Sequence, residues 1–310
     1  MREGSLEGAE AASMGKYILI DIGGTAIKYA LSEEDRILFR NIIKTESGRG
    51  RGWIQKRVMG LTEELLSCGE EVSGIAISSA GIVDIRRGRI VCAGPTIPDY
   101  SGTEFKQPME ERFGIPCEIE NDVNCAALAE YRSGAAKGSS SALCLTIGTG
   151  IGGAAVLDGK ILRGFTGSAC EVGYMHMRGS SFEELGAASI LSKRISERKG
   201  GSAADWDGKR IFREAKKGDR DCILALDELC AALGEGISNI VYILNPEVVV
   251  LGGGIMAEED YLYPRIRREL DKNLIPMLSE NTKLRMAKHK NEAGMLGAYY
   301  HFCAARGGRQ

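Results

Sequence analysis

The chain has 310 residues, of which 44% are hydrophobic, and this length can form two domains with separate cores and a cleft between them. Its 40 Lys and Arg residues stand against 42 Asp and Glu residues, so there is no net basic charge for nucleic acid or an anionic membrane surface. No apolar run approaches the roughly 20 residues that span a bilayer, and residues 1–13 lack the apolar core of a signal peptide. We therefore expect a cytoplasmic protein that binds neither nucleic acid nor membranes.

The folded sequence is expected to begin near Lys16, because residues 1–14 are rich in Gly, Ala, Ser and Glu and are expected to form a disordered tail. Three strands then follow in a meander. They are predicted over 17–21, 27–31 and about 36–42, with a glycine turn at 23–25 between the first two.

Alternating helices and strands follow the meander. Apolar spacing predicts a helix over 51–67 and a strand over 74–78, then a short helix over 103–113 and a strand over 117–120. A further helix opens at Asn121 or Asp122, either of which can cap its first turn, and runs to about residue 136.

The second half of the chain repeats the opening unit. Strands are predicted over 141–147, 153–157 and 161–164 around the glycine turn 148–152, and short helices, a long helix, a buried strand and a last helix follow over 181–218, 222–244, 248–251 and 294–304. We therefore predict a duplicated α/β architecture. Its small domain covers 15–121 and its large domain 122–292, and the C-terminal helix, 293–306, packs back on the small domain.

The first glycine turn carries candidate phosphate ligands. It joins two strands, so it is neither a Walker loop nor a dinucleotide-binding turn. Gly23 and Gly24 would let backbone amides approach a phosphate, Thr25 adds a hydroxyl, and Asp21 suits a water-mediated hold on magnesium. An ordinary hairpin with a structural aspartate is the alternative.

The second glycine turn contains Gly148, Thr149 and Gly150 within a GxGxxG string, which is weak evidence alone. A strand follows it, which disfavours a dinucleotide site and leaves a phosphate loop or a structural bend. Two such hairpins, one in each domain, could bind the same triphosphate.

Six ordered motifs now support a family resemblance: DIGGT, AISSAGIVD, ENDVNCAALAE, LTIGTGIGGA, CEVGYM and LNPEVVVLGGGI. From Tyr17 nearly to its C-terminus the chain resembles the ROK family of repressors, open reading frames and kinases. That resemblance implies the actin-like ATPase (ribonuclease H-like) fold with an interdomain cleft. It also implies ATP and Mg²⁺, a sugar substrate and a homodimer.

The resemblance assigns roles to single residues. Asp122 matches the catalytic base, although a helix cap is its alternative role, and Asn121 and Glu171 match sugar-binding positions. Glu184 falls where a further sugar-facing glutamate is expected, and Glu183 could be the match instead. The adenosine-side loop corresponds to Gly252, Gly253 and Gly254.

The chain departs from the family at two places. Tyr174 replaces a zinc-binding histidine and residues 175–181 replace a cysteine run, so we expect no zinc, since Cys170 and His176 cannot close a tetrahedral site alone. Thr96 replaces an asparagine that contacts the sugar. Threonine makes fewer hydrogen bonds, so the acceptor sugar stays open.

These observations predict an ATP-dependent kinase for the 6-hydroxyl of a hexose or hexose derivative, such as glucose, N-acetylmannosamine or a β-glucoside. The alternative is a sugar-sensing regulatory protein of the same family without catalysis. A DNA-binding repressor would need a helix-turn-helix before the first hairpin, and the 20 residues before Asp21 do not suit one. An activator carrying an iron–sulfur cluster would need paired cysteines, and the nine cysteines form no CxxC pair.

Overall fold

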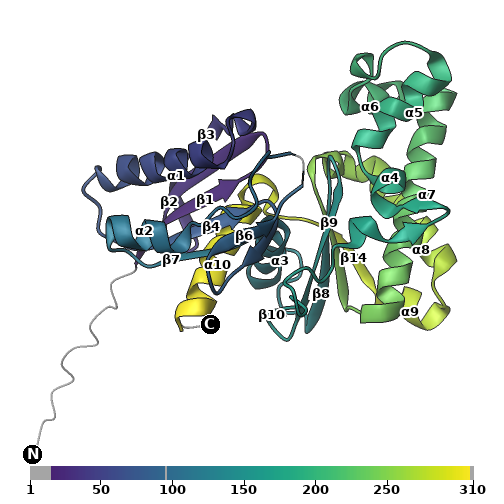
Figure 1. Cartoon of the computed structure of the whole chain (residues 1–310). Helices are drawn as coiled ribbons and strands as arrows, with labels where there is room; N and C mark the ends of the chain where they lie inside the picture. The colour runs from purple at the N-terminus through teal and green to yellow at the C-terminus, as the bar shows by residue number, and fades with distance from the viewer. Residues whose placement is uncertain (1–14, 95, 308–310) are drawn as a thin grey trace, which may run out of the picture.

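The computed structural model describes residues 15–94 and 96–307, in which two five-stranded sheets have the same topology (Figure 1). In each sheet the first three strands form an antiparallel meander, and two later strands extend the sheet in parallel from the first. Sheet one has the order β3-β2-β1-β4-β7 and sheet two the order β10-β9-β8-β13-β14. The duplication expected from the two glycine units is therefore present at the level of strand order.

The strands of sheet one are β1 Lys16–Ile22, β2 Ala26–Glu33, β3 Arg36–Lys44, β4 Val72–Ser79 and β7 Cys117–Asn121. Those of sheet two are β8 Ser141–Ile147, β9 Ile151–Leu157, β10 Lys160–Ile161, β13 Val248–Gly252 and β14 Lys283–Met286. Two small hairpins pair β5 Ile82–Asp84 with β6 Arg89–Cys92, and β11 His176–Met177 with β12 Ser180–Ser181.

The α-helices are α1 Arg51–Leu66, α2 Lys106–Phe113, α3 Asp122–Arg132, α4 Phe182–Gly186, α5 Ser189–Lys199, α6 Gly208–Lys216, α7 Arg220–Leu244, α8 Glu259–Asn273, α9 Pro276–Asn281 and α10 Ala293–Arg306. Short 3₁₀ helices are Ser47–Arg49, Val172–Tyr174, Ala203–Asp205, Gly254–Glu258 and Lys290–Glu292. No helix within these described ranges is both long and apolar enough to span a bilayer.

Sheet one is covered on both faces, which explains why β1 is apolar on both sides. Ile18 and Ile20 pack with Ile54 of α1, whereas Leu19 points to the opposite face and packs with Phe302 of α10. Because successive side chains of a strand alternate between faces, a strand buried on both faces reads as a continuous apolar run.

Helix α3 lies between the two sheets. Its Leu128 packs with Cys144 and Val248 of sheet two, and its Cys125 packs with Ala76 of sheet one and with α10. The other face of sheet two packs against the helices around α7. Asp122, at the start of α3, is therefore held by elements of both halves of the chain.

The C-terminal helix α10 returns to sheet one and packs across it and against α3, as its yellow ribbon among the purple and blue elements of Figure 1 shows. The division of domains at residue 121 stays a prediction, and the expected tail over 1–14 lies outside the described residues.

Most predicted elements lie within a few residues of their observed bounds, with three corrections. The helix expected to reach residue 136 ends at Arg132, and Ser133 and Gly134 follow it in turns. The strand expected over 161–164 is only Lys160–Ile161. Strand β14 has no counterpart in the sequence prediction, because its four residues alternate between polar and apolar but are too few for that alternation to be a strong signal.

Gly297 allows α10 to approach α3 at backbone distance, since a Cβ atom there would lie 1.7 Å from the Cys125 carbonyl oxygen. We predict that Gly297→Ala lowers the free energy of unfolding by about 1–3 kcal/mol or more, because neither backbone can yield without moving a helix. Urea denaturation measures this.

Gly60→Ala is the matched control. It makes the same change within α1, where no atom lies within 4 Å of the new Cβ. Alanine favours helix more than glycine does, so this variant should be more stable than the wild type by up to about 1 kcal/mol. Equal stability of the two variants would contradict the close approach at Gly297.

Candidate active site

Asn121 and Asp122 stand where β7 becomes α3. The Asn121 Oδ1 atom accepts hydrogen bonds from the backbone amides of Val123 and Asn124, so Asn121 is the N-cap. Its Nδ2 atom donates to the Gly81 carbonyl and to Asp122 Oδ1, both at 3.0 Å. Of the two capping candidates in the sequence, Asn121 has this role, and it also orients Asp122.

The surroundings of Asp122 raise the pKa of its carboxyl group to about 7. Burial is the largest cause and the negative charge of Asp21 the next, whereas the hydrogen bond from the Val123 amide lowers the pKa. A carboxylate with a pKa near neutrality can accept a proton from a substrate more readily than an ordinary aspartate.

Asp21 ends β1 with 9% of its surface exposed. Its Oδ1 accepts from the Ser78 hydroxyl at 2.7 Å, and its Oδ2 pairs with Lys28 Nζ at 3.0 Å. A Cβ on Gly294 would lie 2.5 Å from Asp21 Oδ1, so the start of α10 abuts this carboxylate. Three segments far apart in sequence therefore fix its position.

The first glycine turn joins β1 to β2. The Gly23 amide donates to the Ala26 carbonyl, and the Thr45 hydroxyl donates to the Gly23 carbonyl at 2.7 Å. Thr25 is exposed at this turn. Gly24 faces Thr96, because a Cβ atom added at Gly24 would lie 3.0 Å from the Cβ atom of Thr96.

The second glycine turn and the loop after β13 border one cavity of about 550 Å³. The Gly148 amide donates to the Gly150 carbonyl, and the Thr149 carbonyl accepts from the Ser189 hydroxyl at 2.6 Å. The cavity is lined by Gly148, Thr149, Gly254, Lys209, Phe212 and eight further residues.

Gly252 and Gly253 directly precede Gly254, which lines this cavity. Gly253 has φ +100°, and a Cβ there would lie 2.1 Å from the Ile147 carbonyl oxygen. Gly252 lies against Ala287, with a Cβ distance of 3.3 Å. The loop thus needs glycine to lie against β8.

Glu171 reaches the Asp122 cavity from the segment between β10 and β11. Cys170, directly before it, has φ +68°, a conformation that side chains other than glycine rarely adopt. Burial, and then the charge of Glu183, raise the pKa of Glu171. Cys170, with its strained backbone, thus directly precedes a carboxylate, that of Glu171, whose proton affinity is increased.

Glu184 has a local structural role in the cap of α4. Glu184 accepts from the Ser180 hydroxyl and the Ser181 amide in a capping box at the start of α4, and these bonds lower its pKa. Glu183 instead accepts from the Ile151 amide at 3.0 Å and lies near Glu171. Glu184 is the third residue of its helix and closes the cap, whereas Glu183 contacts the β9 strand that begins at Ile151, and which of the two would contact a sugar stays a prediction.

A second cavity, again of about 550 Å³, surrounds Asp122. It brings together Asn121, Asp122, Glu171 and Tyr174 among its lining residues. Tyr174 is 73% exposed, so its hydroxyl is free to meet a ligand. The predicted site residues did not include the other nine lining residues, among them Gly81, Cys92, Gly94 and Ser168. Gly81 lies in the AISSAGIVD motif, which could have indicated it.

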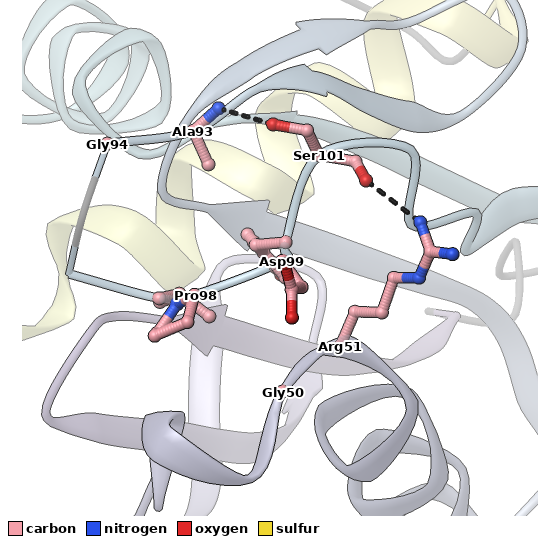
Figure 2. A pocket seen from close by; sticks show the side chains of 9 residues that line it. Gly50, Arg51, Ala93, Gly94, Pro98, Asp99 and Ser101 are labelled. Atoms are coloured by element: carbon pink, nitrogen blue, oxygen red, sulfur yellow. Dashed lines mark hydrogen bonds between the residues drawn. The ribbon is translucent and has the colours of Figure 1, made fainter.

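Thr96 is not among these lining residues and lies instead beside Gly24. Figure 2 shows the neighbouring cavity of about 600 Å³, which shares Ala93 and Gly94 with the Asp122 cavity. The Arg51 guanidinium donates to the Ser101 carbonyl at 3.1 Å and the Ala93 amide to the Ser101 hydroxyl at 3.1 Å. These two bonds fasten the ends of the loop that contains Thr96.

The arrangement can hold a hydroxyl compound at Asp122 and a polyanion at the two glycine turns. Both hairpins lie close to the Asp122 cavity. Asp21 of the first hairpin is near enough to raise the pKa of Asp122, and Gly152 and Gly153 of the second line the cavity. Within residues 15–94 and 96–307 no three His, Cys, Asp or Glu side chains gather as metal ligands. That the chain binds no zinc stays a prediction.

Comparisons with known proteins agree with this geometry. The chain is 49% identical to an uncharacterized protein of Clostridium perfringens over 93% of this chain and 98% of that one. It is 32% identical to a β-glucoside kinase of Listeria monocytogenes over 93% and 97% of the two chains.

Its structure also matches a ROK family glucokinase from Streptomyces griseus in complex with glucose and AMPPNP, with a TM-score of 0.80, 28% identity and coverage of 93% and 99%. Such ROK sugar kinases have the actin-like ATPase fold, which confirms the predicted fold class. The ROK family model matches residues 17–304, and the chain belongs to the ROK family.

Proposed function

We propose that this protein is an ATP-dependent kinase that phosphorylates the 6-hydroxyl of a hexose or hexose derivative. The observation that carries the proposal is Asp122, a carboxylate with its pKa raised to about 7, in a cavity beside both glycine turns. Relatives that are sugar kinases support the same class of reaction.

In the proposed reaction the sugar hydroxyl lies against Asp122 and its oxygen attacks the γ-phosphorus of ATP. The new bond joins the sugar oxygen to phosphorus, the bond from phosphorus to the β–γ bridging oxygen breaks, and ADP leaves. Asp122 takes the hydroxyl proton. Asn121 holds the Asp122 carboxylate in place for this step, since it donates to Oδ1.

The sugar would be oriented by Glu171, Tyr174 and Glu183. Carboxylates accept hydrogen bonds from hydroxyls at several lone pairs, and a tyrosine hydroxyl can donate or accept. Burial, and after it the charge of Glu183, raise the pKa of Glu171, and two carboxylates so placed suit a ligand that carries several hydroxyl donors.

The nucleotide would lie between the two glycine turns and the loop 252–254. Gly23, Gly24 and Thr25 would contact the phosphates from one side and Gly148, Thr149 and Gly150 from the other. The adenosine would enter the cavity lined by Gly254, Lys209 and Phe212. Phe212 supplies an apolar surface there, which suits an aromatic base.

Asp21 fits a role in holding Mg²⁺. Mg²⁺ keeps several waters and uses one or two carboxylates together with phosphate oxygens, and Asp21 and Asp122 are the hard oxygen donors at this place. A bound Mg²⁺ would neutralise charge on the phosphates. The homodimer and the cytoplasmic location implied by the family stay predictions.

The test of the function is an assay of ADP release with Mg²⁺ and ATP over glucose, mannose, N-acetylglucosamine, N-acetylmannosamine, fructose, allose and cellobiose. Turnover with at least one sugar is expected, with the phosphate located on the 6-hydroxyl by NMR. ATP and sugar binding without turnover would instead support a sugar-sensing regulatory protein.

We predict that Asp122→Asn lowers kcat by about 10²–10⁴-fold, because the variant cannot accept the proton. ATP and the sugar that the wild type phosphorylates should still bind in calorimetry. Asp158→Asn, on the exposed β9–β10 turn and outside the described cavities, is the control and should keep wild-type turnover.

The same substitution should raise the melting temperature at pH 8. The Asp122 pKa is raised on folding, so its ionised form is disfavoured in the folded state, and this cost is complete above about pH 7 and absent below the unfolded pKa. Asn removes the cost. A melting temperature below that of the wild type at pH 8 would contradict the burial of the charge.

The pH dependence of the wild type follows from the same group. We predict that kcat/KM for the sugar falls about tenfold per pH unit below pH 7 and is level above it, because Asp122 must be ionised to accept the proton. Initial rates between pH 5.5 and 8.5 measure this. A level profile down to pH 5.5, with the protein still folded, would remove Asp122 as the base.

A further inference from the structure

Glu120, the residue before Asn121 on β7, is a buried carboxylate that the reaction does not use. It is 1% exposed. Its Oε1 accepts from the Asn121 amide at 2.8 Å and from Asn124 Nδ2 at 3.0 Å, so it braces the first turn of α3. Its Oε2 accepts from Arg163 Nε at 2.9 Å and Nη2 at 2.6 Å.

Arg163 comes from the other half of the chain, directly after β10. The Arg163 carbonyl accepts from the Ala169 amide at 3.0 Å and so closes the loop 163–169. Cys170 and Glu171 follow this loop at once, and Ser168 and Glu171 both line the Asp122 cavity. The side chain of Arg163 thus joins the base of this loop to the strand that delivers Asp122.

His301 of α10 also approaches Glu120, with Nδ1 3.8 Å from Oε2. Burial lowers the pKa of His301, so at neutral pH the imidazole is uncharged and Arg163 supplies the positive charge beside Glu120. A buried carboxylate requires such a partner, and a guanidinium that binds through two nitrogens fixes direction as well as charge.

We infer that Arg163 is a positioning residue, whose ion pair with Glu120 sets the placement of Glu171 relative to Asp122. The inference deepens the proposed function and rests on it, because the two carboxylates would contact opposite sides of one sugar. Displacement of a substrate-orienting group by about 1 Å can cost about 100-fold in rate.

The test compares Arg163→Met with Lys106→Met. Lys106 pairs with Glu118, also buried on β7, at 2.9 and 2.8 Å, and Glu118 also pairs with Arg306, so the control removes one cation from a buried carboxylate on the same strand without a link to Glu171. We expect Arg163→Met to lower kcat/KM for the sugar about 10- to 100-fold, with KM for ATP within about twofold of the wild type. Lys106→Met should leave both within about twofold.

Three further measurements separate positioning from general stability. In a Glu120→Gln background, Arg163→Met should lower kcat/KM for the sugar by less than about threefold further, because the ion-pair partner of Arg163 is already lost. Hydrogen exchange of the backbone amides in 164–171 should be faster in Arg163→Met and unchanged in Lys106→Met. Arg163→Lys should restore part of the lost sugar kcat/KM.

The inference is overturned if Arg163→Met and Lys106→Met behave alike, or if sugar and ATP kinetics change equally. Should Arg163→Met not fold, Arg163→Gln is used for the same comparisons. Failure of the wild type to phosphorylate any sugar would overturn the proposed function instead. The exchange measurement then still decides whether Arg163 holds the loop.

Discussion

The site depends on one constraint, which is that Asp122 must ionise although its surroundings disfavour the charged form. Asp122 lies at the first turn of α3, where burial and the charge of Asp21 oppose ionisation and the hydrogen bond from the Val123 amide supports it. The position is tolerable because the amides of a helix N-terminus favour negative charge. The raised proton affinity is therefore a consequence of where the helix begins.

The placement of α3 between the two sheets gives that helix start its neighbours. Sheet one contributes Asp21, sheet two contributes Gly152 and Gly153, and α10 abuts Asp21 at Gly294. Glycines at these contacts are required by distance, as at Gly297 and Gly253, where any side chain would meet a carbonyl oxygen. The close contacts that pack the helices and sheets together therefore also bring the residues of the site together.

The residues around Glu171 show how strain and charge are combined. Cys170 adopts a left-handed backbone conformation that is costly for any residue except glycine, and such a residue persists only where its surroundings hold it. The closed loop 163–169 and the buried Glu120–Arg163 pair are the contacts that hold it from the upstream side. Substrate orientation in this protein would thus depend on polar contacts outside the cavity itself.

The sequence by itself determined the fold class, the duplicated meander, the family and the location of Asp122 at a helix start, because these depend on local periodicity, glycine turns and ordered motifs. It could not show that Glu184 closes a capping box with Ser181 while Glu183 contacts the Ile151 amide, since neighbouring helix residues differ by about 100° in direction and their contacts depend on where the helix begins. It did not show the pairing of Arg163 with Glu120, because residues 43 positions apart are brought together only by packing. The raised pKa of Asp122 likewise follows from tertiary structure alone, since it arises from burial and from a charge on another strand.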